Sequence, residues 1–225
     1  MGLGVGSRRS AGFLALNQRF AQFEHRSIHV LVTRGRRISV GKSKVVKKFG
    51  LSDPTKLKPF DKKDNLLQVI IETPKNCRNK YAFDPDQEIF ALKKVLPAGM
   101  EFPYDFGFLP QTIADDGDPI DVLLLMDAPA FPGCLVKARL IGVIEGEQKE
   151  SGGKTTRNDR LLAVAEANHN YQDIKKISDI PRVLLDELGE FFVNYHRLEG
   201  KKYRVIGHFS TQVALKLIKK AQKAA

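Results

Sequence analysis

Tryptophan is absent from the 225-residue chain, and cysteine occurs only twice, at Cys77 and Cys134. Two cysteines so far apart cannot build a disulfide framework or a zinc site of the usual cysteine spacing. No apolar run approaches the roughly 18 uncharged residues that a membrane-spanning helix needs. These absences exclude a disulfide scaffold, a cysteine zinc centre and a membrane-spanning helix.

Acidic residues are nearly missing from residues 1–50, where Glu24 is the one acid among eleven Arg and Lys residues. The other 175 residues carry 26 basic and 25 acidic side chains, so the net charge of +11 belongs almost wholly to the N-terminal segment. An argument from charge to nucleic-acid binding therefore applies to that segment alone.

Residues 1–52 are rich in Gly, Ser and Arg and lack sustained periodicity. This composition favours a basic, disordered N-terminal extension. An organellar targeting peptide is an alternative, because such peptides are rich in Arg and poor in acids. An arm that binds nucleic acid or another anionic surface is a third. Residues 53–225 are predicted to form one folded domain, entered through a polar, Pro-containing linker at 53–65.

Short apolar runs separated by turn residues predict six or seven strands between residues 66 and 165. From residue 184 to 195 the apolar spacing changes to that of one helix face, and Pro181 suits the first turn of this helix. Residues 203–209 return to strand character, and Ser210 can cap a final helix. We therefore expect an α+β domain, mostly β, as a barrel or sandwich with two late helices. The expected strands are 66–72, 80–83, 89–95, 102–109, 120–126, 134–144 and 161–165.

Four carboxylates lie within residues 115–121, immediately before an apolar run. In an extended chain Asp116 and Asp118 point to the same side, and the bend at Pro119 can return Asp121 to it. Like charges this close repel unless a cation lies between them, and oxygen ligands favour Mg²⁺, Mn²⁺ or Ca²⁺. A solvated acidic turn is the alternative. The spacing does not fit an EF-hand, because Asp121 stands where that loop needs glycine.

The hexapeptide Asp-Gly-Asp-Pro-Ile-Asp at 116–121 resembles the signature of soluble, Mg²⁺-dependent family I inorganic pyrophosphatases. Upstream, residues 102–110 are similar to the family's segment Tyr-Pro-x-Asn-Tyr-Gly-Tyr-Ile, and other family segments follow in order. The resemblance covers residues 66–209 and leaves out the basic N-terminal segment. The further matching segments are 69–72, 79–81, 173–175, 179–181 and 191–195.

The resemblance implies a five-stranded, OB-like closed barrel with flanking strands and two helices in the C-terminal half. It also implies an inorganic diphosphatase, which hydrolyses pyrophosphate to two phosphates with a metal-activated water. It places metal ligands on Asp116, Asp118 and Asp121, and makes Asp118 the catalytic group that orients and deprotonates the water. The implied substrate-binding residues are Glu72, Lys80, Lys94, Arg160 and Tyr195.

Three departures from the family pattern bear on the site. Phe106 replaces a tyrosine and so removes one phosphate hydrogen bond, and His196 replaces a lysine, which makes that charge depend on pH. The family's second acidic loop reads Asp-Glu-Gly-Glu-x-Asp-x-Lys. Here Glu-Gly-Glu at 145–147 precedes an insertion of about nine residues that ends before Asn-Asp-Arg at 158–160. We predict Glu145 and Asp159 as the further metal ligands, with Glu147 and Asn158 as alternatives.

The resemblance implies several Mg²⁺ ions per active site, with Mn²⁺ or Zn²⁺ as substitutes, and pyrophosphate and phosphate as ligands. We expect a cytoplasmic homo-oligomer without membrane or nucleic-acid partners; organellar targeting by residues 1–52 is the alternative location. Two other functions stay open. One is a catalytically weakened pyrophosphatase relative. The other is an OB-fold nucleic-acid-binding module with a basic arm, which the near-neutral body with its acidic centre disfavours.

Overall fold

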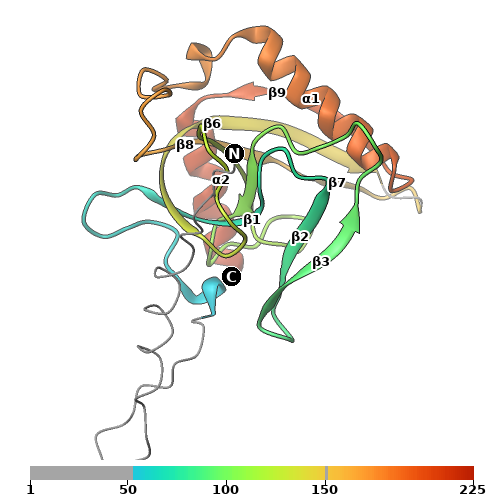
Figure 1. The fold of residues 1–225 in the computed structure, drawn as a ribbon, viewed down its shortest axis with the longest axis horizontal. Helices are drawn as coiled ribbons and strands as arrows, with labels where there is room; N and C mark the ends of the chain where they lie inside the picture. The colour runs from blue at the N-terminus through green and yellow to red at the C-terminus, as the bar shows by residue number, and fades with distance from the viewer. Residues whose placement is uncertain (1–52, 150–151) are drawn as a thin grey trace, which may run out of the picture. The chain divides into compact units, whose positions relative to one another are not determined.

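The computed structural model describes residues 53–149 and 152–225, so the expectations for residues 1–52 lie outside the described residues. Five strands close into a ring, in which only β5 and β8 run parallel and the pairing of β6 with β1 completes the circle. The mostly β barrel predicted from the short apolar runs is therefore confirmed (Figure 1). The order around the ring is β1 (Leu67–Thr73), β4 (Asp105–Phe108), β5 (Asp121–Leu125), β8 (Arg160–Ala165) and β6 (Leu135–Lys149).

Alternate residues of the ring strands pack into two apolar clusters, because successive side chains of a strand point to opposite faces. Leu123 and Leu125 join the cluster of helix α1 (Arg182–Arg197). Val122 and Leu124 join that of helix α2 (Thr211–Ala224). The whole β5 run is apolar because each of its faces packs into one of these two clusters, and the carboxylate at its start lies at the edge of the barrel.

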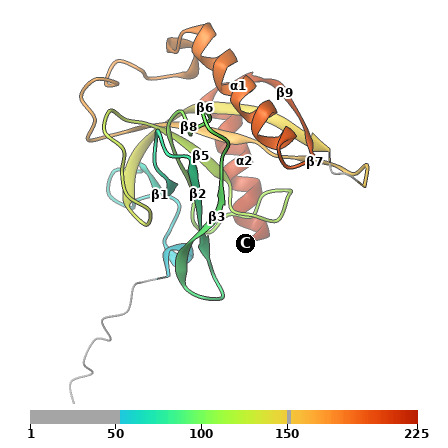
Figure 2. The same ribbon diagram turned by 45° about the vertical axis from the view of Figure 1, so that its right-hand side comes forward.

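The two late helices predicted from the apolar spacing are confirmed. Pro181 is the N-cap of α1, one position before the predicted first turn. Strand β9 (Lys202–Phe209) follows α1 and packs against it while pairing with β6 (Figure 2). Ser210 occupies the N-cap of α2, but its side chain makes no capping hydrogen bond, so the predicted role of the hydroxyl is wrong. Within residues 53–149 and 152–225, no helix is long and apolar enough to cross a membrane.

Strand β6 is longer than the sequence predicts. It continues to Lys149 and forms a hairpin with β7 (Thr155–Arg157), where we expected an inserted loop. Alternation along this extension places Gln148 on the buried face, whereas Glu145 and Glu147 stay partly exposed. The insertion therefore lengthens a strand pair and changes which side chains the second acidic segment presents.

A separate two-stranded sheet, β2 (Asn79–Asp84) with β3 (Ile89–Val95), stands beside β1. The Thr73 hydroxyl donates to the Tyr81 carbonyl and accepts from the Tyr81 amide, which ties β2 to the end of β1. The predicted linker at 53–65 lies against the barrel, because Phe60 forms a β-bridge with Leu67. Two single-turn 3-10 helices, Pro54–Lys56 and Ile177–Asp179, complete the described elements.

Candidate active site

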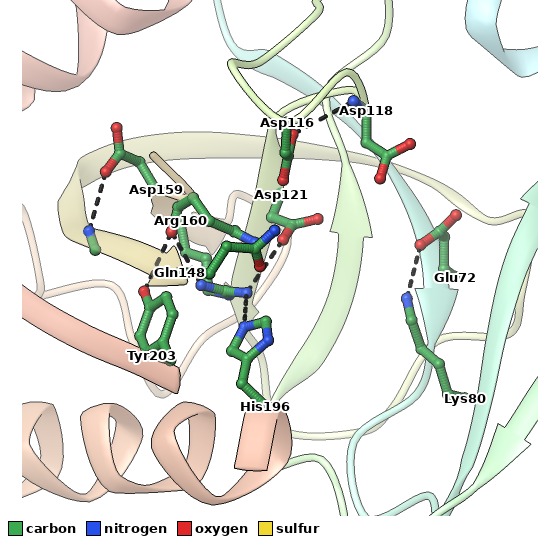
Figure 3. Close-up of polar contacts among 12 residues, drawn as sticks. Glu72, Lys80, Asp116, Asp118, Asp121, Gln148, Asp159, Arg160, His196 and Tyr203 are labelled. Carbon is green, nitrogen blue, oxygen red and sulfur yellow. Dashed lines mark hydrogen bonds and ion pairs between the residues drawn. The ribbon is translucent and has the colours of Figure 1, made fainter. Parts of the chain in front are cut away.

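A cleft of about 590 Å³ lies between the loop before β5, the β2–β3 sheet and the end of α1. Both acidic and basic side chains line it, and they come from segments far apart in the sequence (Figure 3). Its charged and polar lining includes Glu72, Lys80, Asp116, Asp118, Asp121, Gln148, Asn158, Arg160, Tyr195, His196, Glu199 and Lys201.

The loop before β5 and the first residue of β5 bring three of the four carboxylates of residues 115–121 to the cleft. Gly117 adopts a φ of +95°, which a residue without a Cβ tolerates, and its amide donates to the Ala114 carbonyl. The Asp118 amide donates to Asp116 Oδ1 at 3.3 Å, so the turn holds both aspartates on one side. The fourth carboxylate, Asp115, instead pairs with Lys220 of α2 at 2.7 Å. The acidic turn is thus divided between the cleft and the surface.

Burial and neighbouring charge make Asp116 and Asp121 hard to ionise together. Burial, with the nearby charges of Glu72 and Asp116, raises the pKa of Asp121 to about 7, although Arg160 and Lys80 oppose the shift. Burial and the Asp118 charge likewise raise the pKa of Asp116. A cation between these carboxylates would offset their burial and reduce their electrostatic repulsion.

The donor set of the loop suits a hard divalent cation, because it consists of oxygen atoms only. Among the described residues, however, no three Asp, Glu, His or Cys side chains are grouped closely enough to hold one ion by themselves. An ion held by these carboxylates would therefore need water or another ligand to complete its coordination, as Mg²⁺ sites commonly do.

Glu72 and Lys80 form an ion pair at 3.0 Å on the opposite side of the cleft. Glu72 is fixed further because its second oxygen accepts from the Phe83 amide at 2.9 Å. The Lys80 ammonium lies 4.3 Å from the centre of the Phe106 ring. Phe106, which lacks a hydroxyl, thus supports the ammonium through its ring face.

Arg160 is held rigidly in the wall of the cleft. Its side chain is 2% exposed, and its guanidinium carbon lies 3.9 Å from the centre of the Phe192 ring. One nitrogen donates to the Asn158 carbonyl at 3.0 Å, and another lies 3.0 Å from His196 Nε2 and 3.6 Å from Asp121. Because arginine only donates, His196 Nε2 must be the unprotonated acceptor. Burial lowers the pKa of His196, and the Arg160 charge adds to the shift.

Tyr195 and Glu199 line the cleft near the end of α1, whereas Lys94 contacts both residues but does not line the cleft. The Lys94 ammonium lies 3.7 Å from the centre of the Tyr195 ring and is paired with Glu199. His196, whose Nδ1 lies 3.6 Å from the Glu199 carboxylate, and then the paired Lys94 lower the pKa of Glu199 to about 2. Lys94 thus supports the lining from outside.

The predicted ligands Glu145 and Asp159 do not line the cleft. Arg157 binds both, Glu145 at 2.6 Å and Asp159 at 2.7 Å, and Asp159 also accepts from the Gly146 amide at 3.0 Å. Glu147 pairs with Arg204 at 2.8 Å. The lining positions are occupied by Gln148 and Asn158 instead, and the physical reason is the strand alternation in the unforeseen β6–β7 hairpin. Of the substrate-binding predictions, Glu72, Lys80, Arg160 and Tyr195 line the cleft.

Gln148, Glu199 and Lys201 line the cleft without having been predicted. The period-2 pattern of a longer strand could have identified Gln148. Glu199 and Lys201 follow the last turn of α1, where the sequence carries no motif that distinguishes them from surface charges.

Comparisons with known proteins agree on one family. A family model described as inorganic pyrophosphatase matches residues 69–225. The inorganic pyrophosphatase of Synechocystis sp. is 41% identical over 165 residues, which are 73% of this chain and 95% of the relative. That of Nostoc sp. is 39% identical over 166 residues, 74% of this chain and 95% of the relative. The crystal structure of inorganic pyrophosphatase from Thermus thermophilus superposes with a TM-score of 0.70 at 30% identity, covering 77% of this chain and 98% of that one.

Proposed function

The chain belongs to the inorganic pyrophosphatase family and is an inorganic diphosphatase with the OB-like fold of that family. We propose that it hydrolyses pyrophosphate in the cleft described above. The observation that carries this placement is the meeting of Asp116, Asp118 and Asp121 with Lys80 and Arg160 around one space. Carboxylates can hold cations and the basic groups can hold phosphate, which is the pair of tasks that a charged diphosphate demands.

Pyrophosphatases of this family depend on metal ions, and for this chain we propose Mg²⁺. Asp116, Asp118 and Asp121 would hold it, because they are the oxygen donors that share one side of the cleft. When bound, divalent cations activate water and neutralise the charge of the phosphates.

Asp118 is proposed as the group that orients the attacking water and accepts its proton. It is the most exposed of the three aspartates that line the cleft, and Figure 3 shows its carboxylate directed toward the side where Glu72 lies. A carboxylate that reaches solvent can bind a water and then release the proton, and proton transfer of this kind contributes on the order of 10²–10⁴ to a rate.

Lys80, Arg160 and Tyr195 are proposed to bind the phosphate oxygens. The guanidinium of Arg160 is already oriented by its buried contacts, so little freedom is lost when an anion binds. The Tyr195 hydroxyl is a neutral donor at pH 7, because burial raises its pKa further above the ordinary value of 10.0. We propose a positioning role for Lys94, which orders Tyr195 and Glu199.

Phosphate release from pyrophosphate, with and without Mg²⁺, tests the proposal. We expect hydrolysis that requires a divalent cation and stops in excess EDTA, with Ca²⁺ a poor activator because its coordination is longer and looser. Activity that persists in excess chelator would contradict the metal mechanism. A folded protein inactive with Mg²⁺, Mn²⁺ and Zn²⁺ alike would favour the weakened relative.

Pyrophosphate and phosphate are the ligands that family membership implies. A homo-oligomeric state, a cytoplasmic location and the absence of nucleic-acid partners stay predictions. Size-exclusion chromatography with light scattering checks the first of these.

A further inference from the structure

Two neutral amides form part of the cleft wall. Asn158 Nδ2 donates to Gln148 Oε1 at 2.8 Å, and the two residues are 7% and 6% exposed. The Asn158 backbone is fixed as well, since its amide donates to the Gly146 carbonyl at 2.9 Å and its carbonyl accepts from the Tyr203 hydroxyl at 3.2 Å. We call Gln148 and Asn158 the amide pair.

A cationic group contacts the amide pair, namely the Arg160 guanidinium, which also lies 3.6 Å from Asp121 where the two sides of the cleft meet. The guanidinium of Arg160 donates to the carbonyl of Asn158 itself, and the ring next to that guanidinium, His196, is neutral. The two carboxylates of this segment, Glu145 and Asp159, are bound to Arg157 outside the cleft lining. The acidic loop before β5 is the contrasting side, where Asp116 and Asp118 carry the negative charge.

A divalent cation would gain little at the amide pair. A cation that loses water needs negative ligands to offset the loss, whereas one of the two amide oxygens already accepts a hydrogen bond and Arg160 repels positive charge. Phosphate oxygens meet the opposite situation, because the N–H groups of amides and of a guanidinium are the donors that they require.

We propose that the amide pair divides the cleft into two parts. Divalent cations bind on the side of Asp116, Asp118 and Asp121. The wall made of the amide pair and Arg160 receives phosphate oxygens and holds no cation of its own. The inference rests on the proposed function and deepens it. It states that one side of the cleft binds metal ions and that the neutral side chains of the amide pair help to bind phosphate on the other side.

Isosteric substitutions test the division, because Gln148→Glu and Asn158→Asp change charge and hardly change shape. Electron paramagnetic resonance of free Mn²⁺, in titrations without substrate, counts the ions bound per chain. We expect Gln148→Glu/Asn158→Asp to bind one more Mn²⁺ than the wild type. Gln172→Glu adds a carboxylate on the exposed surface outside the cleft lining and should leave the count unchanged.

Two outcomes would overturn the division. One is an unchanged Mn²⁺ count in the folded double variant, with folding checked by circular dichroism. The other is a loss of bound Mn²⁺ in Gln148→Leu, which would show that the amide itself holds a cation in the wild type.

Inorganic phosphate probes the other half of the proposal. Calorimetric titration of the metal-free proteins should show phosphate binding at least about tenfold weaker in the double variant than in Gln172→Glu, because like charges then face each other. Equal affinity would overturn the anion role. Both titrations are made without turnover, so they give a result even for a protein that fails to hydrolyse pyrophosphate, and the two failures are distinguishable.

Discussion

Asp115 and Asp118 are three residues apart in one acidic turn, yet their surroundings differ. Asp118 lines the cleft, whereas Asp115 is bound by the Lys220 ammonium at 2.7 and 2.9 Å. Sequence spacing alone could not separate them, because both are carboxylates beside a glycine turn. The pair therefore makes an internal control for the roles proposed within the motif.

We expect Asp118→Asn to lower kcat by about 10²–10⁴, the usual contribution of a general base. The substitution is nearly isosteric, and it removes one of several crowded negative charges, so the metal-free protein should be as stable as the wild type or slightly more so. Steady-state phosphate release and urea unfolding measure the two effects.

Asp115→Asn should cost far less activity, since only an exposed ion pair is lost. If Asp115→Asn abolished hydrolysis while Asp118→Asn did not, the assignment of roles in this turn would be wrong.

His196 should give the pH–rate profile an acid limb. Its pKa is lowered by burial and by Arg160, so it stays neutral at pH 7 and accepts from the guanidinium; it becomes charged only below the ordinary value of 6.5. Protonation then removes the acceptor and sets two cations together. Because the folded pKa lies below the unfolded one, the stability contribution is present above pH 6.5 and is lost as the pH falls.

His196→Gln keeps a neutral acceptor and removes the titration. We therefore expect kcat/KM of this variant to fall less steeply than that of the wild type between about pH 5 and 8. The other charges that face the ring, Glu199 and Lys201, are the same in both proteins. Superimposable profiles would show that another group causes the acid limb.

At the scale of elements, α1 links the core to the cleft. Phe192 is 1% exposed in the core cluster and also lies under the Arg160 guanidinium, while the next turn carries Tyr195 and His196 into the cleft lining. Residues three and four apart share one helix face. The placement of α1 against the core therefore positions the side chains of Phe192, Tyr195 and His196 together.

Phe192→Ala should lower the free energy of unfolding by about 3–5 kcal/mol, the usual cost of removing a buried aromatic ring. It should also lower kcat/KM, because Arg160 loses the ring that orients it. Urea unfolding and steady-state kinetics measure these effects. Val183→Ala, on the exposed side of α1 at 64% exposure, is the matched control and should change stability by no more than about 0.5 kcal/mol.

The β6–β7 hairpin shows where prediction by element failed. A Lys-, Ser- and Gly-rich stretch is typical of a loop, and propensity alone could not show that backbone pairing with β7 and β9 extends β6 to Lys149. This extension decides that Gln148 faces the cleft and Glu145 does not. By contrast, β5 and α1 were predicted correctly because their apolar periods continue for several residues.

At the scale of the whole molecule, the basic N-terminal segment should be dispensable for catalysis. Among residues 53–149 and 152–225, those that line the cleft lie between Thr55 and Lys201, and the family match begins at residue 69. We expect a chain that lacks residues 1–52 to hydrolyse pyrophosphate within a few-fold of the full chain and to melt at a similar temperature. A large fall in melting temperature would show instead that residues 1–52 stabilise the folded domain.

The sequence by itself determined the mostly β class, the two late helices and the acidic loop at 116–121, because local periodicity and short motifs encode these features. Only the tertiary structure decided which charges share the cleft. Asp115 forms an ion pair with Lys220, and Asp159 forms one with Arg157. Gln148 lines the cleft instead. The physical reason is that the surroundings of a side chain depend on strand register and on partners distant in sequence, which one-dimensional spacing does not contain.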